Sequence, residues 1–253
     1  MRELKEFCKQ SLPPKWTFKL RSMKARYADP DMIVLLELAR KFGGANAAAV
    51  DVGASVGIYS GLLSRSFGDV ISIEPHPACQ SYLRRVLPSN CRLVEAAASD
   101  SEGTAVLRVP KSIDGFAQTT RSTVSEANDL DGLAPQNIVE VRVPTSTVDK
   151  IVDEYGAGLP ITLLKIDVEG HEFAVLRGAA RTLSRHKPAL FIELEERHGV
   201  KPTEVLLWLH EIGYDVFSLQ GADFVPVERF SAENLRRSSC GETIWNYVLF
   251  PRT

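Results

Sequence analysis

The stretch Val50-Asp51-Val52-Gly53-Ala54-Ser55-Val56-Gly57 decides the fold prediction. An apolar run from Ala47 leads into it, and a helix-like pattern from Ile58 to Phe67 follows, which predicts a strand, a glycine turn and a helix. That arrangement brings backbone N–H groups and a helix N-terminus close to a small polar ligand. The next expected strand ends in an acid, Glu74. We therefore expect this turn to form the floor of a ligand site.

Strand and helix patterns alternate on both sides of this turn. Strands are expected over residues 47–52, 70–74, 91–97, 161–167, 188–195, 214–219 and 243–250. Helices are expected after Asp29 and over residues 58–67, 78–87, 146–152, 171–185 and 203–211. The alternation predicts an α/β fold whose seven-stranded, mostly parallel sheet carries helices on both faces. No helix-length pattern separates the last two strands, so we expect an antiparallel pair at the edge.

An excursion follows the third expected strand. Residues 103–110 and 138–143 predict a β-hairpin, and residues 113–135 between them show no clear period. We expect a long, mobile loop there. A loop of that length is often a functional lid. A disordered insert is the alternative, and the sequence favours neither.

Composition limits the class of protein and its partners. The 253 residues are 44% hydrophobic and 25% charged with a net charge of −2, as in ordinary soluble domains, so nucleic acid is not an expected partner. The four cysteines are far apart, which fits a reducing cytoplasm. We expect no secretory signal, no membrane span and a cytoplasmic location. We divide the chain into an N-terminal arm and helix (1–45) and a catalytic domain (46–253), with oligomeric state open and a homodimer one option.

The glycine spacing separates three kinds of nucleotide turn. The dinucleotide fingerprint G-x-G-x-x-G fails at Ser55 and Ile58, and the Walker A ending fails at Gly57-Ile58-Tyr59. A ligand without pyrophosphate remains, and S-adenosylmethionine fits. Its methionine end needs a tight turn and a nearby carboxylate, and its ribose needs an acid after the following strand. The expected cofactor residues are Asp51, Gly53, Ala54, Ser55, Gly57 and Glu74, with Ser99 and Asp100 at the adenine edge and Asp167 at a strand end.

A second stretch, Leu164 to Glu172 (L-K-I-D-V-E-G-H-E), leaves the fourth central strand. Asp167 should face the cleft, where it could act near the transferred methyl group, bind the methionine amino group or bind substrate. His171 is a candidate general base, although a histidine at a helix start is more often a surface or capping residue. Glu169 and Glu172 are either capping acids or part of the site, and for Glu172 we favour capping.

The fifth expected strand ends in two further acids, Glu193 and Glu195. Together with Asp167 they could hold a divalent metal such as Mg²⁺. Binding of sugar hydroxyls, or simply a polar strand end, are the alternatives. We commit to no metal and keep this trio as the candidate ligands.

Six motifs in order make the chain resemble the FkbM family of S-adenosylmethionine-dependent methyltransferases. They are D-V-G-A-S-V-G at 51–57, I-E-P at 73–75, A-A-S-D at 97–100, S-T-V-D at 146–149, L-K-I-D-V-E-G-H-E at 164–172 with L-R-G-A at 176–179, and F-I-E-L-E at 191–195. The resemblance implies a Rossmann-like class I methyltransferase fold. It also implies O-methylation of a small-molecule or glycan acceptor. Ser55 departs from the Asn that this family commonly has, which implies a changed cofactor contact.

Two other classes stay open at this point. An NAD-type oxidoreductase is disfavoured by the failed dinucleotide fingerprint. A non-catalytic module that binds an S-adenosyl ligand would keep the same turn without turnover.

Overall fold

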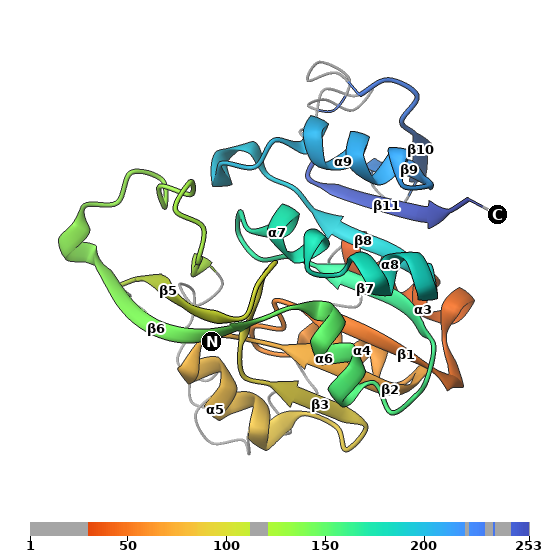
Figure 1. The fold of residues 1–253 in the computed structure, drawn as a ribbon, viewed down its shortest axis with the longest axis horizontal. Helices are drawn as coiled ribbons and strands as arrows, with labels where there is room; N and C mark the ends of the chain where they lie inside the picture. The colour runs from red at the N-terminus through yellow and green to blue at the C-terminus, as the bar shows by residue number, and fades with distance from the viewer. Residues whose placement is uncertain (1–29, 112–120, 221–222, 231–234, 236–243, 253) are drawn as a thin grey trace, which may run out of the picture.

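The computed structural model describes residues 30–111, 121–220, 223–230, 235 and 244–252. An eight-stranded sheet forms its centre, in the order β10-β9-β11-β8-β7-β1-β2-β3 (Figure 1). Its strands are β1 Gly44–Val52, β2 Phe67–Ile73, β3 Cys91–Val94, β7 Ile161–Ile166, β8 Ala189–Glu193, β9 Tyr214–Gln220, β10 Asp223–Pro226 and β11 Asn246–Pro251. β1 pairs in parallel with β2 on one side and β7 on the other. The carboxyl ends of β1 and β7 therefore mark the switch point at which open α/β sheets bind ligands.

The predicted α/β fold is confirmed, and all seven predicted strands lie in this sheet. β11 is antiparallel to β9, as expected, but it also pairs with β8 and so lies inside the sheet rather than at its edge. Tyr247, Val248 and Leu249 of β11 are fully buried, which requires cover on both sides. β10 is an additional edge strand in a region that was expected to be a loop.

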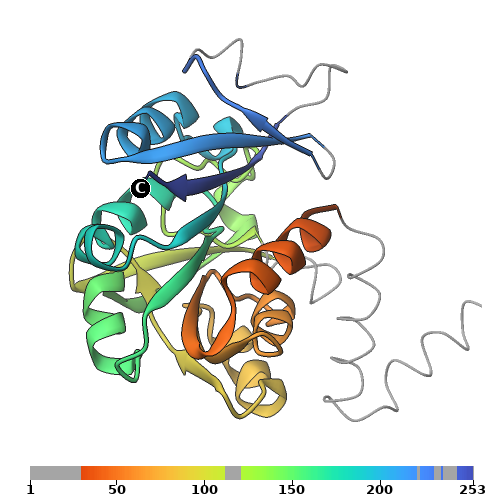
Figure 2. The same cartoon turned by 90° about the vertical axis from the view of Figure 1, so that its right-hand side faces the viewer.

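Helices cover both faces of the sheet, as Figure 2 shows. One face carries α3 Pro30–Phe42, α4 Ile58–Leu63 and α5 Pro77–Val86, and the other carries α6 Val148–Tyr155, α7 Glu172–Arg177, α8 Ala180–His186 and α9 Pro202–Glu211. Alternate residues of each strand point to opposite faces of the sheet. In β1, Val50 and Val52 pack in the core cluster of α6 to α9, whereas Ala47 and Ala49 pack in the cluster of α3 and α4.

Some predicted helix boundaries were wrong. The helix expected over 58–67 ends at Leu63, because β2 already begins at Phe67. The helix expected over 171–185 is two helices, and the break is at Gly178. A Cβ on Gly178 would lie 2.0 Å from the backbone oxygen of Ser99, so the backbone at Ser99 leaves no room for a side chain at position 178. The proposed cap Asp29 and the arm before it lie outside the described residues.

The excursion forms a second, three-stranded sheet that extends away from the first (Figure 1). β5 Gly103–Pro110 and β6 Ile138–Ser146 make the predicted antiparallel hairpin, and β4 Ala97–Ala98 pairs with β6. The third predicted strand is thus divided, since 91–94 belong to the main sheet and 97–98 to the small one. Of the loop between β5 and β6, residues 121–137 are described, and its 3-10 turn spans Pro135–Asn137.

The described part of this loop is held by hydrogen bonds to the main domain. The Thr123 hydroxyl and the Asn128 amide both donate to the backbone oxygen of Glu169, at 2.7 and 2.8 Å. Arg108 of β5 donates to the backbone oxygens of Ser125 and Asn128. The loop therefore fixes the turn after β7 from the side.

Candidate functional site

The glycine turn after β1 packs against the end of β7. Gly53 and Gly57 have φ of +78° and +77°, in the left-handed region that favours glycine. The backbone N–H groups of Gly53 and Ala54 both donate to the Ile73 oxygen at 3.0 Å, and Gly57 closes the turn by donating to the Ala54 oxygen at 2.7 Å. A Cβ on Gly53 would lie 1.8 Å from the backbone oxygen of Asp167. Glycine is therefore required at position 53 by close approach as well as by conformation.

Glu74 lies beside this turn, just past the end of β2. Its two carboxylate oxygens accept the backbone N–H groups of Ser55 and His76, both at 2.7 Å. The residue is only 5% exposed, and burial raises the pKa of Glu74 to about 7. The acid therefore lies beside the turn, and its contact with ribose hydroxyls stays a prediction.

A cavity of about 220 Å³ opens above the turn. Gly53, Ala54, Ser55 and Glu74 line one side, and Asp167 and Glu169 line another. The third side is made by the excursion. It contributes Ala97, Ala98, Leu107, Ser122 and Val124. The excursion is thus a wall of the cavity, which its lack of sequence pattern did not reveal.

Two hydroxyl groups in this lining have no hydrogen-bond partner in the described part of the chain. They are Oγ of Ser55, on the turn, and Oγ of Ser122, on the excursion, and both atoms are buried. Buried polar groups in native proteins nearly always have a partner. Two such groups in the lining of one cavity suit a site for a polar ligand.

Asp51 lies beneath the turn and is not part of the cavity lining. It is fully buried, and its Oδ2 accepts the Ser60 hydroxyl at 2.6 Å. Its Oδ1 lies 3.3 Å from Nζ of Lys165, its register partner on β7. The reason is strand alternation, because Val50 and Val52 face α6 to α9 and Asp51 must then face α4.

Lys165 joins the two turns from below. Its side chain is 1% exposed, and Nζ donates to the Gly53 oxygen at 3.0 Å and lies 3.4 Å from Oδ2 of Asp167. The ring of Tyr59 lies 4.8 Å from the same ammonium group. Sequence reasoning missed this residue, although a lysine inside the apolar strand I-T-L-L-K-I-D is a visible signal. Lys165 neutralises Asp167 and fixes the carbonyl of the glycine turn.

Ser99, Asp100 and His171 also lie outside the cavity lining. Nε2 of His171 is 3.0 Å from Oγ of Ser99, and Arg177 donates to Oδ2 of Asp100 at 2.9 Å. Burial lowers the pKa of His171. These residues join the end of β4 to α7, while their chain neighbours Ala97 and Ala98 reach the cavity.

The acids at the end of β8 do not assemble around a common point with Asp167. Burial and the charge of Asp167, to which it is hydrogen-bonded, raise the pKa of Glu193 to about 10. Glu195 pairs with Arg197 and lies 3.7 Å from Nε2 of His198. Within the described ranges, no three His, Cys, Asp or Glu side chains are arranged to hold a metal ion.

Glu169 is the cavity residue whose role the sequence left open. Its backbone has φ of +57°, and Oε2 lies 3.1 Å from Nε2 of His198. Burial and the neighbouring acids raise the pKa of Glu169 to about 8. Glu172, in contrast, is a first-turn acid of α7, and its Oε1 accepts the N–H groups of Gly170 at 3.0 Å and Val168 at 3.3 Å, so it braces the turn before the helix and does not cap the helix.

Comparison with known proteins identifies relatives of this chain. Residues 51–216 match the methyltransferase FkbM domain family. Methyltransferase sdnD from Sordaria araneosa is 27% identical over 218 residues, which cover 76% of this chain and 82% of that protein.

Two solved structures are similar at lower identity. Methyltransferase FkbM from Methylobacillus flagellatus KT is 19% identical with a TM-score of 0.47; the match covers 81% of this chain but only 44% of that one. A TehB-like SAM-dependent methyltransferase from Corynebacterium glutamicum ATCC 13032 is 14% identical with a TM-score of 0.48, over 94% of this chain and 98% of that one. Among the helices that the structure describes, none is long and apolar enough to cross a membrane.

The family match covers both turns, the excursion and most of the main sheet. The resemblance seen in the six motifs is thereby confirmed, and the NAD-type alternative has no support. The chain belongs to the FkbM methyltransferase domain family and is an S-adenosylmethionine-dependent methyltransferase.

Proposed function

We propose that this protein methylates a hydroxyl oxygen of a sugar, a glycan or a small natural product. One observation carries the proposal. The cavity joins a cofactor-type floor, made by the glycine turn and Glu74, to a wall with two carboxylates, Asp167 and Glu169. Carboxylates accept hydrogen bonds from hydroxyl groups, so this wall is chemically suited to an alcohol.

The lining residues fit S-adenosylmethionine along its length. Gly53 and Asp167, at the ends of β1 and β7, suit the methionine end, and Glu74, past β2, suits the two ribose hydroxyls. Ala97 and Ala98 lie beyond them on the excursion side, where an apolar purine face would be covered. The unpartnered hydroxyl of Ser55 gives the turn one more donor or acceptor for the ligand.

When bound, S-adenosylmethionine supplies an electrophilic methyl group on a sulfonium centre. The chain then has to orient the acceptor hydroxyl in line with that methyl group and to exclude water. Leu107 and Val124 give the excursion wall an apolar surface that excludes water. Asp167, held by Lys165, offers a fixed carboxylate next to the glycine turn.

The test combines a binding measurement with a product assignment. Calorimetry should detect S-adenosylhomocysteine but not NAD(H). Transfer of a labelled methyl group should then be measured over a panel of sugars and hydroxylated natural products, and NMR should place the methyl group on oxygen. A methyl group found on nitrogen, carbon or sulfur would overturn the O-methylation proposal. Cofactor binding with no transfer to any acceptor in the panel would favour the non-catalytic module.

A further inference from the structure

We infer that Glu169 is the proton acceptor of the transfer reaction and that His198 is its positioning and proton-sharing partner. This inference rests on the proposed O-methylation, since a hydroxyl must lose its proton when its oxygen gains a methyl group. His198 was not among the residues expected from the sequence to act in the site. It comes from the 3-10 turn Glu196–His198, which follows β8.

The other carboxylates of the cavity lining are already engaged. Both oxygens of Glu74 accept backbone N–H groups. Asp167 is paired with the buried ammonium of Lys165. Glu169 instead has a titratable base as its partner, because Nε2 of His198 lies 3.1 Å from its Oε2. Asp167 is also hydrogen-bonded to Glu193, so titratable neighbours alone do not separate the two residues. Of these three acids, Glu169 is the one whose partner is a basic ring that can take up a proton from it.

The backbone of Glu169 is held in a strained conformation from several sides. A glutamate at φ of +57° persists where its surroundings enforce it, and such residues cluster at functional sites. Thr123 and Asn128 both donate to its backbone oxygen. Next to it, a Cβ on Gly170 would lie 2.3 Å from the backbone oxygen of His198, so glycine at 170 lets the His198 segment approach. The conformation aims the Glu169 side chain between the cavity and His198.

The pair has a connected route to the surface. His198 is 8% exposed, and its Nε2 also lies 3.7 Å from Oε2 of Glu195. Glu195 pairs with Arg197, whose side chain is 49% exposed and lies 3.6 Å from Asp131. Burial lowers the pKa of His198, so a proton that Glu169 passes to this ring is not retained there and is released to solvent at the partly exposed edge.

The proton balance of the step is complete. The acceptor oxygen forms its bond to the methyl carbon as the carbon–sulfur bond breaks, and the electron pair of that bond neutralises the sulfonium. The hydroxyl proton moves to the Glu169 carboxylate and then to His198 and solvent. The groups that face Glu169 are Asp167, Glu172, Glu193, Glu195, Arg197 and His198. Burial and the charges of Asp167, Glu195 and Glu172 raise the pKa of Glu169 to about 8, so the carboxylate is a strong enough base near neutral pH.

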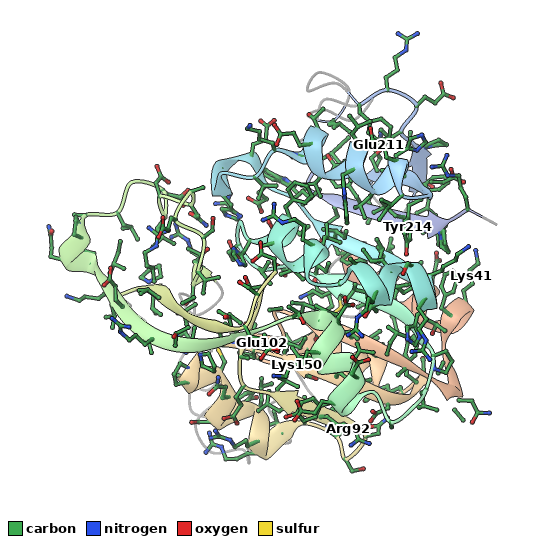
Figure 3. All side chains as sticks on the ribbon, in the orientation of Figure 1. Lys41, Arg92, Glu102, Lys150, Glu211 and Tyr214 are labelled. Carbon is green, nitrogen blue, oxygen red and sulfur yellow. The ribbon has the colours of Figure 1, made fainter. Side chains whose placement is uncertain are left out.

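The kinetic test separates proton removal from cofactor binding. Glu169→Gln should lower kcat by roughly 10²–10⁴-fold, the usual range for a lost general base, with the S-adenosylhomocysteine Kd within about 3-fold of wild type. In wild type, kcat should rise with pH to a plateau above about 8, and Glu169→Gln should lose that limb. His198→Leu removes the ring nitrogen that hydrogen-bonds to the ionised carboxylate, so the rise of kcat with pH in this variant should move to higher pH. Glu211→Gln, at an exposed position on α9 (Figure 3), is the control and should match wild type. Unchanged kcat in Glu169→Gln would overturn the inference.

A second measurement needs no acceptor. The His198 ring should be titrated by NMR with S-adenosylhomocysteine bound. Two coupled steps are expected in wild type and one in Glu169→Gln, because interacting groups titrate as a pair. A single identical step in both proteins would overturn the inference even if methyl transfer were demonstrated. Failure of wild type to methylate any hydroxyl would count against the proposed function, and the NMR result would still decide on the pair.

Discussion

Two turns meet above the sheet of this protein, and they are built in opposite ways. The turn after β1 holds Ser55 at φ of +49°, and the turn after β7 holds Glu169 at φ of +57°, so each carries a non-glycine residue in the left-handed region. The first turn is stabilised by the adjacent strand, through the oxygen of Ile73 and the carboxylate of Glu74. The second is stabilised by residues from remote segments, namely Thr123, Asn128 and His198.

The difference separates the two tasks of a methyltransferase. The cofactor is held by a turn whose backbone is bonded to the neighbouring strand. A short run of small residues in a fixed order is enough to specify such a turn. In the proposed function, the acceptor side is held by side chains that a loop and a distant turn bring together. We therefore expect damage to the first turn to abolish cofactor binding, and damage to the second to lower turnover with cofactor binding intact.

Gly53→Ala should have the largest effect on the first turn. The added Cβ would lie 1.8 Å from the Asp167 oxygen, so either the turn or the end of β7 must move. We expect at least a ~100-fold loss of S-adenosylhomocysteine affinity by calorimetry, about 2.7 kcal/mol. Gly132→Ala is a matched control, because Gly132 has φ of +70° with nothing within 4 Å. It should lose about 1–2 kcal/mol of stability with unchanged affinity. Wild-type affinity in a folded Gly53→Ala protein would contradict the assigned floor.

Glu74→Gln should weaken cofactor binding by about 10-fold, and it also tests a pH effect. Burial raises the pKa of Glu74 to about 7, and the ionised carboxylate accepts hydroxyl groups better than the protonated acid. Wild-type affinity for S-adenosylhomocysteine should therefore rise as pH increases from 6 to 8. The glutamine variant should show no such rise in calorimetry at the same pH values. An equal rise in both proteins would assign the titration to another group.

Thr123→Val tests the second turn without changing a residue of the turn itself. It removes a 2.7 Å hydrogen bond to the Glu169 oxygen and the acceptor for the Ser125 N–H. A buried unsatisfied group costs about 1–3 kcal/mol, so the melting temperature should fall. We expect kcat to fall by roughly 3–10-fold with the cofactor Kd within about 2-fold, since the turn is loosened but not removed. Thr104→Val, at an exposed position of β5, should change neither quantity.

Ser55→Asn should have the smallest effect. Asparagine tolerates φ near +50° better than serine does, and its longer side chain can still hydrogen-bond to the ligand. Cofactor affinity should be equal to wild type or up to about 3-fold tighter. Ser55→Ala removes the unpartnered hydroxyl and should weaken binding by about 2–10-fold, the range expected for one hydrogen bond. A 10-fold loss in the asparagine variant would show that the shorter side chain is required.

The sequence predicted the fold well because local patterns specify it. Apolar strand runs, helix periods and glycine stops identified all seven strands that it expected in the main sheet. The position of β11 between β8 and β9 was not predictable in the same way, since both neighbours of an antiparallel strand are chosen by packing. The sequence pattern also continues without a break at Ala97, where β4 leaves the main sheet because it pairs in parallel with β6.

The residues predicted for the site divide into those that line the cavity and those that do not. Gly53, Ala54, Ser55, Glu74 and Asp167 line it, whereas Gly57 does not. Asp51, Ser99, Asp100 and His171 are close in sequence to cavity residues but point elsewhere, into the α4 interface or the contact between β4 and α7. One residue of shift along a strand reverses the face, and a spacing pattern alone does not fix that parity.

By itself, the sequence determined the α/β fold, the family and the position of the glycine turn, because these depend on short segments whose conformation is set by glycines and by strand and helix periodicity. Only the tertiary structure decided how Lys165 ties Asp51 to Asp167, that the excursion forms a cavity wall, and that His198 meets Glu169. Asp51 and Lys165 are 114 positions apart and Glu169 and His198 are 29 apart, and no local pattern encodes the distance between side chains on separate elements. The surroundings of Glu169 are therefore set by packing, whereas the glycine turn is set by the local sequence.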